Sequence, residues 1–160
     1  MSDQLRARIH QSKEFSSLEE AVFLGLCLTA QLLEQPWNRY LVARERINVT
    51  QYNVLRILRG AGAGGLTVGE ISLRMINRDR DVMPLMEQLV ARGLVVDADA
   101  KPHDRLDRLA ITPDGLALLA NLDPDVKAMP PRIFDHLTDR ELAQLDALLG
   151  RVMEGDLSFP

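Results

Sequence analysis

Apolar residues recur at intervals of three and four along much of the chain, the spacing expected of helices with one buried face. The longest such stretch covers residues 17–46 and starts with Ser17 and Glu20, which are spaced as a capping box. Pro36 lies inside it, and an interior proline removes a backbone hydrogen bond. The pattern therefore predicts either one helix bent at Pro36 or two helices that meet there. Residues 1–16 are polar and aperiodic, which predicts a flexible arm.

Shorter periodic stretches follow this first segment. One helix is predicted after Thr50 and ends at the glycines of residues 60–65, and a second is predicted to start at Thr67, with Glu70 completing a capping box. Residues 94–112 alternate in the manner of two short strands around a loop. Further helices are predicted from Pro113 and after Thr138, which again has a glutamate three residues later.

The stretch "INRDRDVMPLMEQLVARGLV", residues 76–95, contains a helix with a proline at its front. Pro84 is tolerated in a first helical turn, because the amides there have no partner within the helix. With Arg80 or Asp81 as the N-cap, Pro84 would mark the start of this helix. Asp79 or Asp81 would accept hydrogen bonds from the free amides and would lie at the positive end of the helix dipole.

The composition fits one compact domain or one lobe of an oligomer: 160 residues, 46% hydrophobic and 26% charged. The sequence contains no apolar run of about 18 residues and no signal-peptide pattern, so we expect a soluble, cytoplasmic protein without a membrane partner. A single cysteine, Cys27, excludes an internal disulfide. It lies among leucines, and we expect a buried apolar side chain rather than a thiol sensor.

The predicted elements follow the order of a winged helix-turn-helix: helix, helix, turn, helix and a two-stranded hairpin. Long helices are predicted at both ends. Four segments in this order resemble the MarR family of transcriptional regulators: "VTQYNVLRIL" (49–58), "LTVGEISLRM" (66–75), "LVARGLV" (89–95) and "DRLDRLAITPDGLALL" (104–119). The resemblance covers roughly residues 17–152. The predicted fold is mainly α with a small two- or three-stranded β wing.

The resemblance implies a homodimer whose first and last two helices interleave, so that two winged-helix regions meet successive grooves of duplex DNA. The predicted organisation is a flexible arm (1–16), an N-terminal dimerisation segment (17–48), a DNA-binding region (49–112) and C-terminal dimerisation helices (113–160). The last two helices carry more apolar residues than a small winged-helix region needs, which favours a dimer, although they could instead close a monomeric core: Leu116, Leu118, Leu119, Leu122, Leu142, Leu145, Leu148, Leu149 and Val152.

The second helix of a helix-turn-helix presents its N-terminal residues to base edges, and the wing reaches an adjacent groove. The predicted DNA contacts are therefore Arg78, Arg80, Met83, Gln88, Lys101, His103, Arg105 and Arg108. Asp104 and Arg105 match an Asp-Arg pair of the family's wing. Met83 and Pro84, in contrast, stand where the family typically has hydroxyl residues and an arginine.

Residues 74–108 hold seven basic and seven acidic residues, so the predicted DNA-binding surface is neutral. A strong DNA binder is usually basic here. The sequence thus supports two functions: a sequence-specific DNA-binding regulator, expected to be a repressor, or a winged-helix dimer with weakened DNA binding that acts as an interaction or ligand-binding module. Several arginines could also pair internally with neighbouring aspartates.

Trp37, Arg39 and Tyr40 are candidates for a small-molecule site, since an aromatic ring beside an arginine can hold an aromatic or phenolic anion. A lone tryptophan is also a common core residue. The effector is therefore implied mainly by the family resemblance. The three histidines lack metal-ligand spacing, and no phosphate loop or nucleophile motif is present, so we expect neither an enzyme nor a cofactor or metal.

Overall fold

The computed structural model describes residues 2–76, 82–98 and 108–155, which form two compact units, residues 1–116 and 117–160. The helices are α1 (Ser2–Arg8), α2 (Leu18–Glu45), α3 (Val49–Ala61), α4 (Val68–Arg74), α5 (Met83–Ala91), α6 (Pro113–Ile133) and α7 (Asp139–Met153), and a 3-10 turn, η1 (Gly62–Gly64), follows α3. The strands are β1 (Leu66–Thr67), β2 (Val95–Asp97) and β3 (Arg108–Ile111). None of the helices in this described part is long and apolar enough to cross a membrane.

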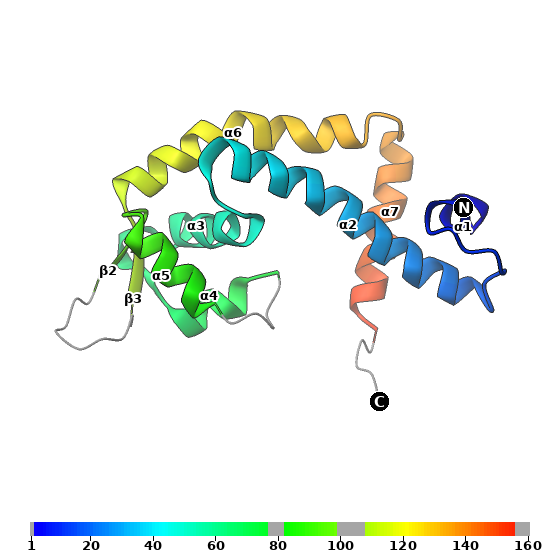
Figure 1. Ribbon diagram of the computed structural model, residues 1–160, viewed down its shortest axis with the longest axis horizontal. Coiled ribbons are helices and arrows are strands. Elements are labelled where there is room, and N and C mark those ends of the chain that lie inside the picture. The colour runs from blue at the N-terminus through cyan, green and yellow to red at the C-terminus, as the bar shows by residue number, and fades with distance from the viewer. Residues whose placement is uncertain (1, 77–81, 99–107, 156–160) are drawn as a thin grey trace. The chain divides into compact units, whose positions relative to one another are not determined.

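Within the first unit, α3, α4, α5 and the three strands gather at one end of α2, and α1 lies at the other end (Figure 1). The helix α2 continues through Pro36 without interruption, which settles the choice between one helix and two. Ser17 is its N-cap and accepts a hydrogen bond from the backbone N–H of Glu20. The Glu20 carboxylate accepts from Ser16 instead of closing the box on Ser17.

The helix α3 lies at the centre of this group and contacts α2, α4, α5 and β3. It begins at Val49, whereas the helix was predicted to follow Thr50, because Asn48 and Gln51 form a capping box that the sequence prediction did not use. Its buried face includes Val54, Leu55 and Leu58, each with no exposed surface. These side chains anchor the core on which the second helix of the helix-turn-helix rests.

The three strands form an antiparallel sheet in the order β1-β3-β2, which confirms a winged helix and gives the wing a third strand. Leu66 pairs with Leu109 across β1 and β3, and Val95 pairs with Ile111 across β2 and β3. The approach to β1 requires glycine at position 65, where φ is +60° and an added Cβ would lie 2.5 Å from the Leu109 carbonyl oxygen.

The helix α5 starts differently from the prediction. Its N-cap is Val82, which makes no side-chain capping bond, and Pro84 lies in the first turn as expected. Asp79, Arg80 and Asp81, the predicted capping and dipole residues, lie outside the described residues. The helix ends at Ala91, and two residues later Gly93, with a φ of +69°, allows the N–H groups of Gly93 and Leu94 to bond back to the carbonyls of Val90 and Leu89.

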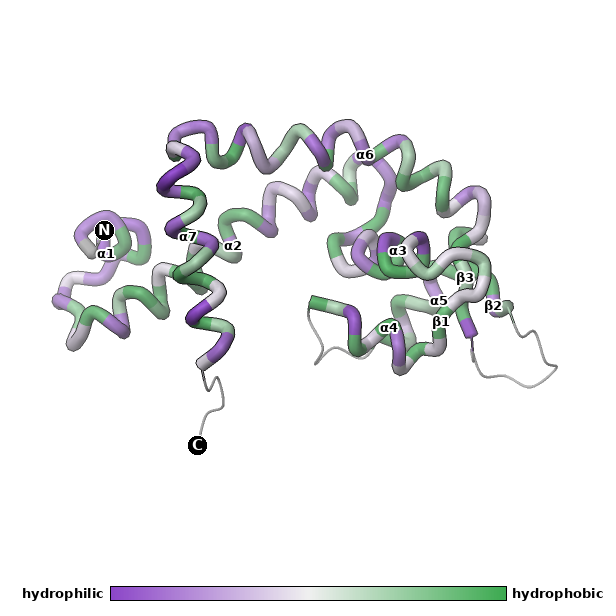
Figure 2. Tube along the Cα trace, turned by 180° about the vertical axis from the view of Figure 1, so that it is seen from behind, coloured by the Kyte–Doolittle hydropathy of each residue, from purple (hydrophilic) through white to green (hydrophobic). Residues whose placement is uncertain are grey.

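The last two helices, α6 and α7, differ strongly in length relative to the prediction and in burial. The prediction for α7 is confirmed, including the Thr138–Glu141 capping box. The helix α6 was predicted over residues 113–122 but continues to Ile133, about three turns further, and contains Pro124, Pro130 and Pro131. Leu118, Leu119 and Leu122 of α6 are buried, but α7 has no buried residue. Figure 2 shows hydrophobic and hydrophilic residues alternating along α7.

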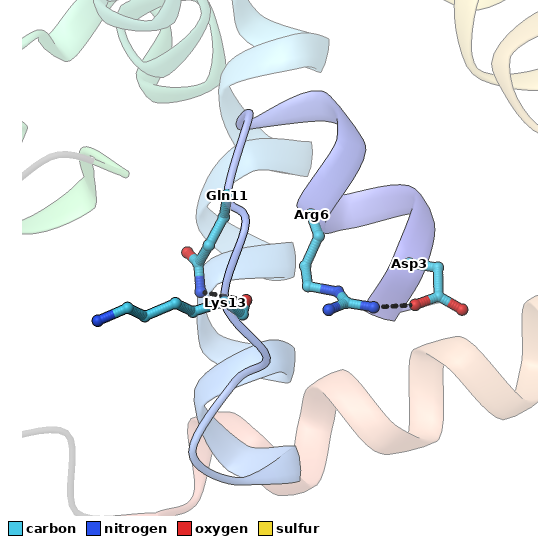
Figure 3. Close-up of polar contacts among 4 residues, drawn as sticks. All are labelled: Asp3, Arg6, Gln11 and Lys13. Carbon is cyan, nitrogen blue, oxygen red and sulfur yellow. Dashed lines mark hydrogen bonds and ion pairs between the residues drawn. The ribbon is translucent and has the colours of Figure 1, made fainter.

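The N-terminal segment was predicted to be a flexible arm, but residues 2–8 form the helix α1. The reason is a single apolar side chain: Leu5 is 6% exposed and anchors α1, which contacts α2. Arg6 pairs with Asp3 on the exposed side of α1, and the Gln11 side chain donates to the Lys13 carbonyl oxygen at 3.3 Å (Figure 3). One buried leucine was too weak a periodic signal to predict this helix.

Candidate nucleic-acid interface

The helix α5 is the second helix of the helix-turn-helix and divides cleanly into two faces. Met86 and Leu89 are completely buried, and Met83 is half-buried. The solvent face presents Pro84, Glu87, Gln88 and Ala91. In a helix-turn-helix this outward face is the one that enters a groove of DNA. Glu87 and Gln88 therefore supply the polar groups of this face within the described residues.

Gln88, a predicted DNA contact, is oriented by a residue from another helix. Its side-chain oxygen Oε1 accepts a hydrogen bond of 2.9 Å from Nε2 of Gln51 in α3. Gln51 is only 5% exposed, and its own Oε1 accepts from the backbone N–H of Asn48 at 3.0 Å. A buried amide with both ends bonded has a fixed orientation. The position of the Gln88 side chain is therefore set from inside the protein.

Arg92, directly after α5, ties that helix to α2. Its guanidinium donates to the carbonyl oxygens of Glu45 and Arg46 at 2.8 Å each. These carbonyls belong to the last turn and C-cap of α2, where backbone oxygens lack partners within the helix. A cation at the negative end of a helix dipole is also favourable. Arg92 thus serves the internal structure, although the sequence analysis counted it among the basic residues of this surface.

Arg108, another predicted DNA contact, is half-buried at the start of β3. Its Nη1 donates to the carbonyl oxygens of Gly64 and Gly65, at 3.4 and 3.3 Å. Nearby, the Thr67 backbone N–H and hydroxyl bond to the Glu70 carboxylate, and these bonds, with Arg108 and Arg74 adding attraction, lower the pKa of Glu70. The Glu70 carboxylate, which lies outside residues 74–108, thus carries a negative charge close to Arg108.

The other predicted DNA contacts lie outside the described residues. They are Arg78, Arg80, Lys101, His103 and Arg105. Their positions relative to α5 and to β3 therefore remain predictions, as does a DNA contact by any of the eight residues.

The candidate ligand residues separate into two groups. The ring of Trp37 stacks on Tyr40, with centroids 5.4 Å apart and planes 11° apart, and meets Tyr52 of α3 edge to face at 5.4 Å. The guanidinium carbon of Arg56 lies 5.9 Å from the Tyr52 ring centroid. Trp37 and Tyr40 are half-buried. They form an aromatic cluster at the junction of α2 and α3, with Arg56 as its neighbouring cation.

Arg39 faces elsewhere. It lies with Gln31, Glu34, Gln35 and Asn38 along an open, polar hollow of about 500 Å³. Positions 31, 35 and 39 share one face of a helix, whereas 37 and 40 share another. The structure therefore brings Trp37 and Tyr40 together and leaves Arg39 apart from them.

Sequence reasoning missed Gln51, Arg92, Tyr52 and Arg56. The Asn48–Gln51 spacing was a usable capping signal, but no local pattern connects Gln51 with Gln88 or Arg92 with Arg46. Cys27 is exposed in this chain, which corrects the expectation of a buried side chain. Among the described residues, no group of three or more His, Cys, Asp or Glu side chains is placed to hold a metal ion.

No protein-family model and no curated protein matches the sequence. Solved structures, in contrast, do match this chain. A MarR transcription factor from Planctomyces limnophilus is 30% identical over 86% of this chain and 98% of its own, with a TM-score of 0.62. A MarR family transcriptional regulator from Streptomyces coelicolor in complex with DNA is 24% identical over 92% and 93% of the two chains, with a TM-score of 0.70. An organohalide-sensing transcriptional regulator in its 2,4-dichlorophenol-bound form shares the fold at 14% identity and a TM-score of 0.74, over 86% and 80% of the chains.

Proposed function

The chain belongs to the MarR family of transcriptional regulators, and from this premise we propose that it is a homodimer that binds specific duplex DNA sequences in the cytoplasm and represses transcription. The observation that carries the proposal is α5, which follows α4 in a helix-turn-helix beside the wing and exposes a polar face. The structure of the Streptomyces coelicolor relative in complex with DNA supports the same use of the fold here.

Dimerisation is supported by α7. Its exposed hydrophobic residues form one stripe at helical spacing: Leu145, Leu148, Leu149 and Val152. A stripe of this kind on a chain of this size marks an interaction surface. The N-terminal half of α2 is also unusually apolar at its surface, with Leu18 69% exposed and Phe23 54% exposed. These surfaces fit the dimerisation segments proposed for residues 17–48 and 113–160.

Relief of repression by a small aromatic or phenolic ligand is the finer part of the proposal. The aromatic cluster of Trp37, Tyr40 and Tyr52, with Arg56 beside it, offers stacking surface and positive charge. A ligand there changes DNA affinity only by binding more tightly to one arrangement of the dimer than to another. Trp37 is the only tryptophan, so its fluorescence reports directly on this cluster. Titration with 4-hydroxybenzoate should quench it, and Tyr52→Ala should abolish the effect.

The experiment for DNA binding is fluorescence anisotropy with the labelled DNA upstream of the protein's own gene and a scrambled duplex of equal length, over a range of salt concentrations. We expect tight binding to the native fragment only, weakening steeply as salt rises. Arg105→Ala should weaken binding and reduce the salt slope by about one. Equally weak binding to both duplexes, together with ligand-induced quenching of Trp37, would favour the alternative of a ligand-binding or interaction module. The neutral charge of residues 74–108 is the observation behind that alternative.

A further inference from the structure

On the exposed face of α5, the orientation of one side-chain amide, that of Gln88, is determined by a hydrogen bond to a buried residue. Gln88 is exposed on α5, and a glutamine amide normally offers both an acceptor oxygen and a donor NH2 group to a base. This pair of groups is what allows glutamine to recognise adenine through N6 and N7. Which end of the amide points outward therefore determines what Gln88 recognises.

The orientation follows from a chain of bonds that starts at the backbone. The Asn48 N–H can only donate, so the atom of Gln51 that lies 3.0 Å from it must be the acceptor Oε1. The other end of Gln51, the donor Nε2, then lies 2.9 Å from Gln88. Because Nε2 can only donate, Gln88 must turn its own Oε1 inward to accept.

The backbone of α3 keeps this chain of bonds in place. Gln51 is the N3 residue of the Asn48 capping box, and its backbone N–H also donates to the Asn48 side chain at 2.8 Å. Gln51 is 5% exposed, so rotating its amide would leave a buried N–H facing a buried NH2 group without an acceptor. Such a mismatch is costly inside a protein.

We propose that Gln51 is a specificity-determining residue that holds the Gln88 amide with its NH2 group outward, so that α5 selects guanine over adenine at the base Gln88 contacts. Guanine offers two acceptors, O6 and N7, in the major groove, which suit an NH2 donor. The bidentate contact with adenine would need the Gln88 oxygen to accept from N6, but that oxygen is turned inward toward Gln51. The inference rests on the proposed DNA-binding function and adds the class of base recognised.

The test is selection of bound duplexes from a pool with a randomised centre, followed by sequencing, for the full-length wild type and four variants. Wild type should enrich guanine about tenfold over adenine at one position in each half-site. Gln88→Ala should lose the preference at that position and keep the rest of the consensus. Gln51→Met, which neither donates nor accepts strongly, should free Gln88 and reduce the guanine preference.

Gln51→Glu is the variant with the most specific expected result, because it should change which base is preferred. A carboxylate can still accept from the Asn48 N–H, and glutamate is an accepted N3 residue of a capping box. It cannot donate, so Gln88 would turn its NH2 group inward and present Oε1 to DNA. The preferred base should change from guanine to adenine or cytosine, which carry amino groups in the major groove. Gln4→Glu, the same substitution on the exposed surface of α1, is the control and should leave the guanine position unchanged.

A second measurement needs no DNA. In the free protein, side-chain amide protons of Gln51 should exchange slowly with solvent, and those of Gln88 should exchange rapidly. Protected Gln88 protons, an adenine preference in wild type, or a consensus that Gln88→Ala leaves unchanged would each overturn the inference while DNA binding stands. Failure of wild type to enrich any sequence would instead overturn the proposed function, and this inference with it.

Discussion

The helices α3 and α7 are similar as sequences and opposite in their environments. Both have a capping box and a stripe of apolar residues along one face. In α3 the stripe is buried, with Leu55 and Leu58 fully covered, whereas in α7 Leu148 remains 57% exposed and no residue is buried. The same pattern thus has two outcomes: α3 organises a core within the chain, and α7 leaves its apolar face exposed, which is the face that the proposed dimer would use.

The largest expected effect is on stability and concerns the buried apolar stripe of α3. Leu55→Ala removes a fully buried side chain from α3 and leaves a cavity. We expect the free energy of unfolding to fall by about 2–5 kcal/mol, measured by denaturant unfolding. A loss of less than about 1 kcal/mol would mean that the α3 contacts do not form the core as described.

The exposed side is tested by placing a charge on α7. Leu148→Asp should raise the dissociation constant of the dimer by at least about tenfold, because the carboxylate would be desolvated in the interface. Analytical ultracentrifugation measures the constant, and circular dichroism checks that the helices persist. Ala147→Asp introduces the same residue on the opposite face of α7 and should leave the constant nearly unchanged. Equal effects of the two variants would contradict the proposed dimer surface.

A smaller effect is expected for the bond between α5 and α2. Arg92→Ala removes two charged hydrogen bonds to the Glu45 and Arg46 carbonyls. Because Arg92 is exposed, we expect a loss of only about 1 kcal/mol in the free energy of unfolding. Arg151→Ala, in the last turn of α7, is the comparison and should change it by less than about 0.5 kcal/mol. If the two variants are equally stable, Arg92 contributes no measurable link between the helices.

The smallest effect concerns the glutamate of the capping box at the start of α7, for which α4 offers a matched example. Backbone and hydroxyl hydrogen bonds from Thr138 lower the pKa of Glu141 at the start of α7, as those from Thr67 lower the pKa of Glu70 at α4. A lowered pKa in the folded state adds stability above the ordinary glutamate pKa, and this contribution is lost as pH falls through the lowered value. Thr138→Ala removes the hydroxyl bond and keeps the backbone N–H of residue 138, so the pKa of Glu141 should rise only part of the way to its ordinary value while that of Glu70 stays low, as followed by NMR titration of the carboxyl carbons. An unchanged pKa of Glu141 would mean that the backbone N–H alone lowers it and that the hydroxyl adds nothing.

The helix starts show how far local chemistry is predictive. The starts of α4 and α7 were predicted correctly, since a capping box is formed by residues three positions apart. The same reasoning placed the start of α3 two residues too late and did not predict α1. For α5 it chose acidic and basic residues as N-caps, but Val82 occupies that position without a side-chain bond. Helix starts without a local signature depend on packing that the sequence pattern does not display.

The candidate site residues also divide into those that local sequence spacing predicts and those that only packing brings together. Trp37 and Tyr40 are three residues apart on one helix, so their stacking followed from sequence spacing, whereas Tyr52 and Arg56 joined them from α3. Arg39 was grouped with them because it is adjacent in sequence, yet adjacent residues on a helix face different directions. Gln88 was predicted as a DNA contact, and its partner Gln51 lies 37 positions earlier.

The sequence by itself determined the fold class, the order of the elements, the amphipathic faces and two of the capping boxes, because these depend on residues within one or two helical turns. Only the tertiary structure decided which apolar stripes are covered, which arginines bond to backbone carbonyls and which end of the Gln88 amide faces outward. Those outcomes depend on groups that meet across tens of residues, where burial and hydrogen-bond polarity act between helices. The path from Asn48 through Gln51 to Gln88 is such a case: each residue is ordinary alone, and the folded arrangement fixes their roles.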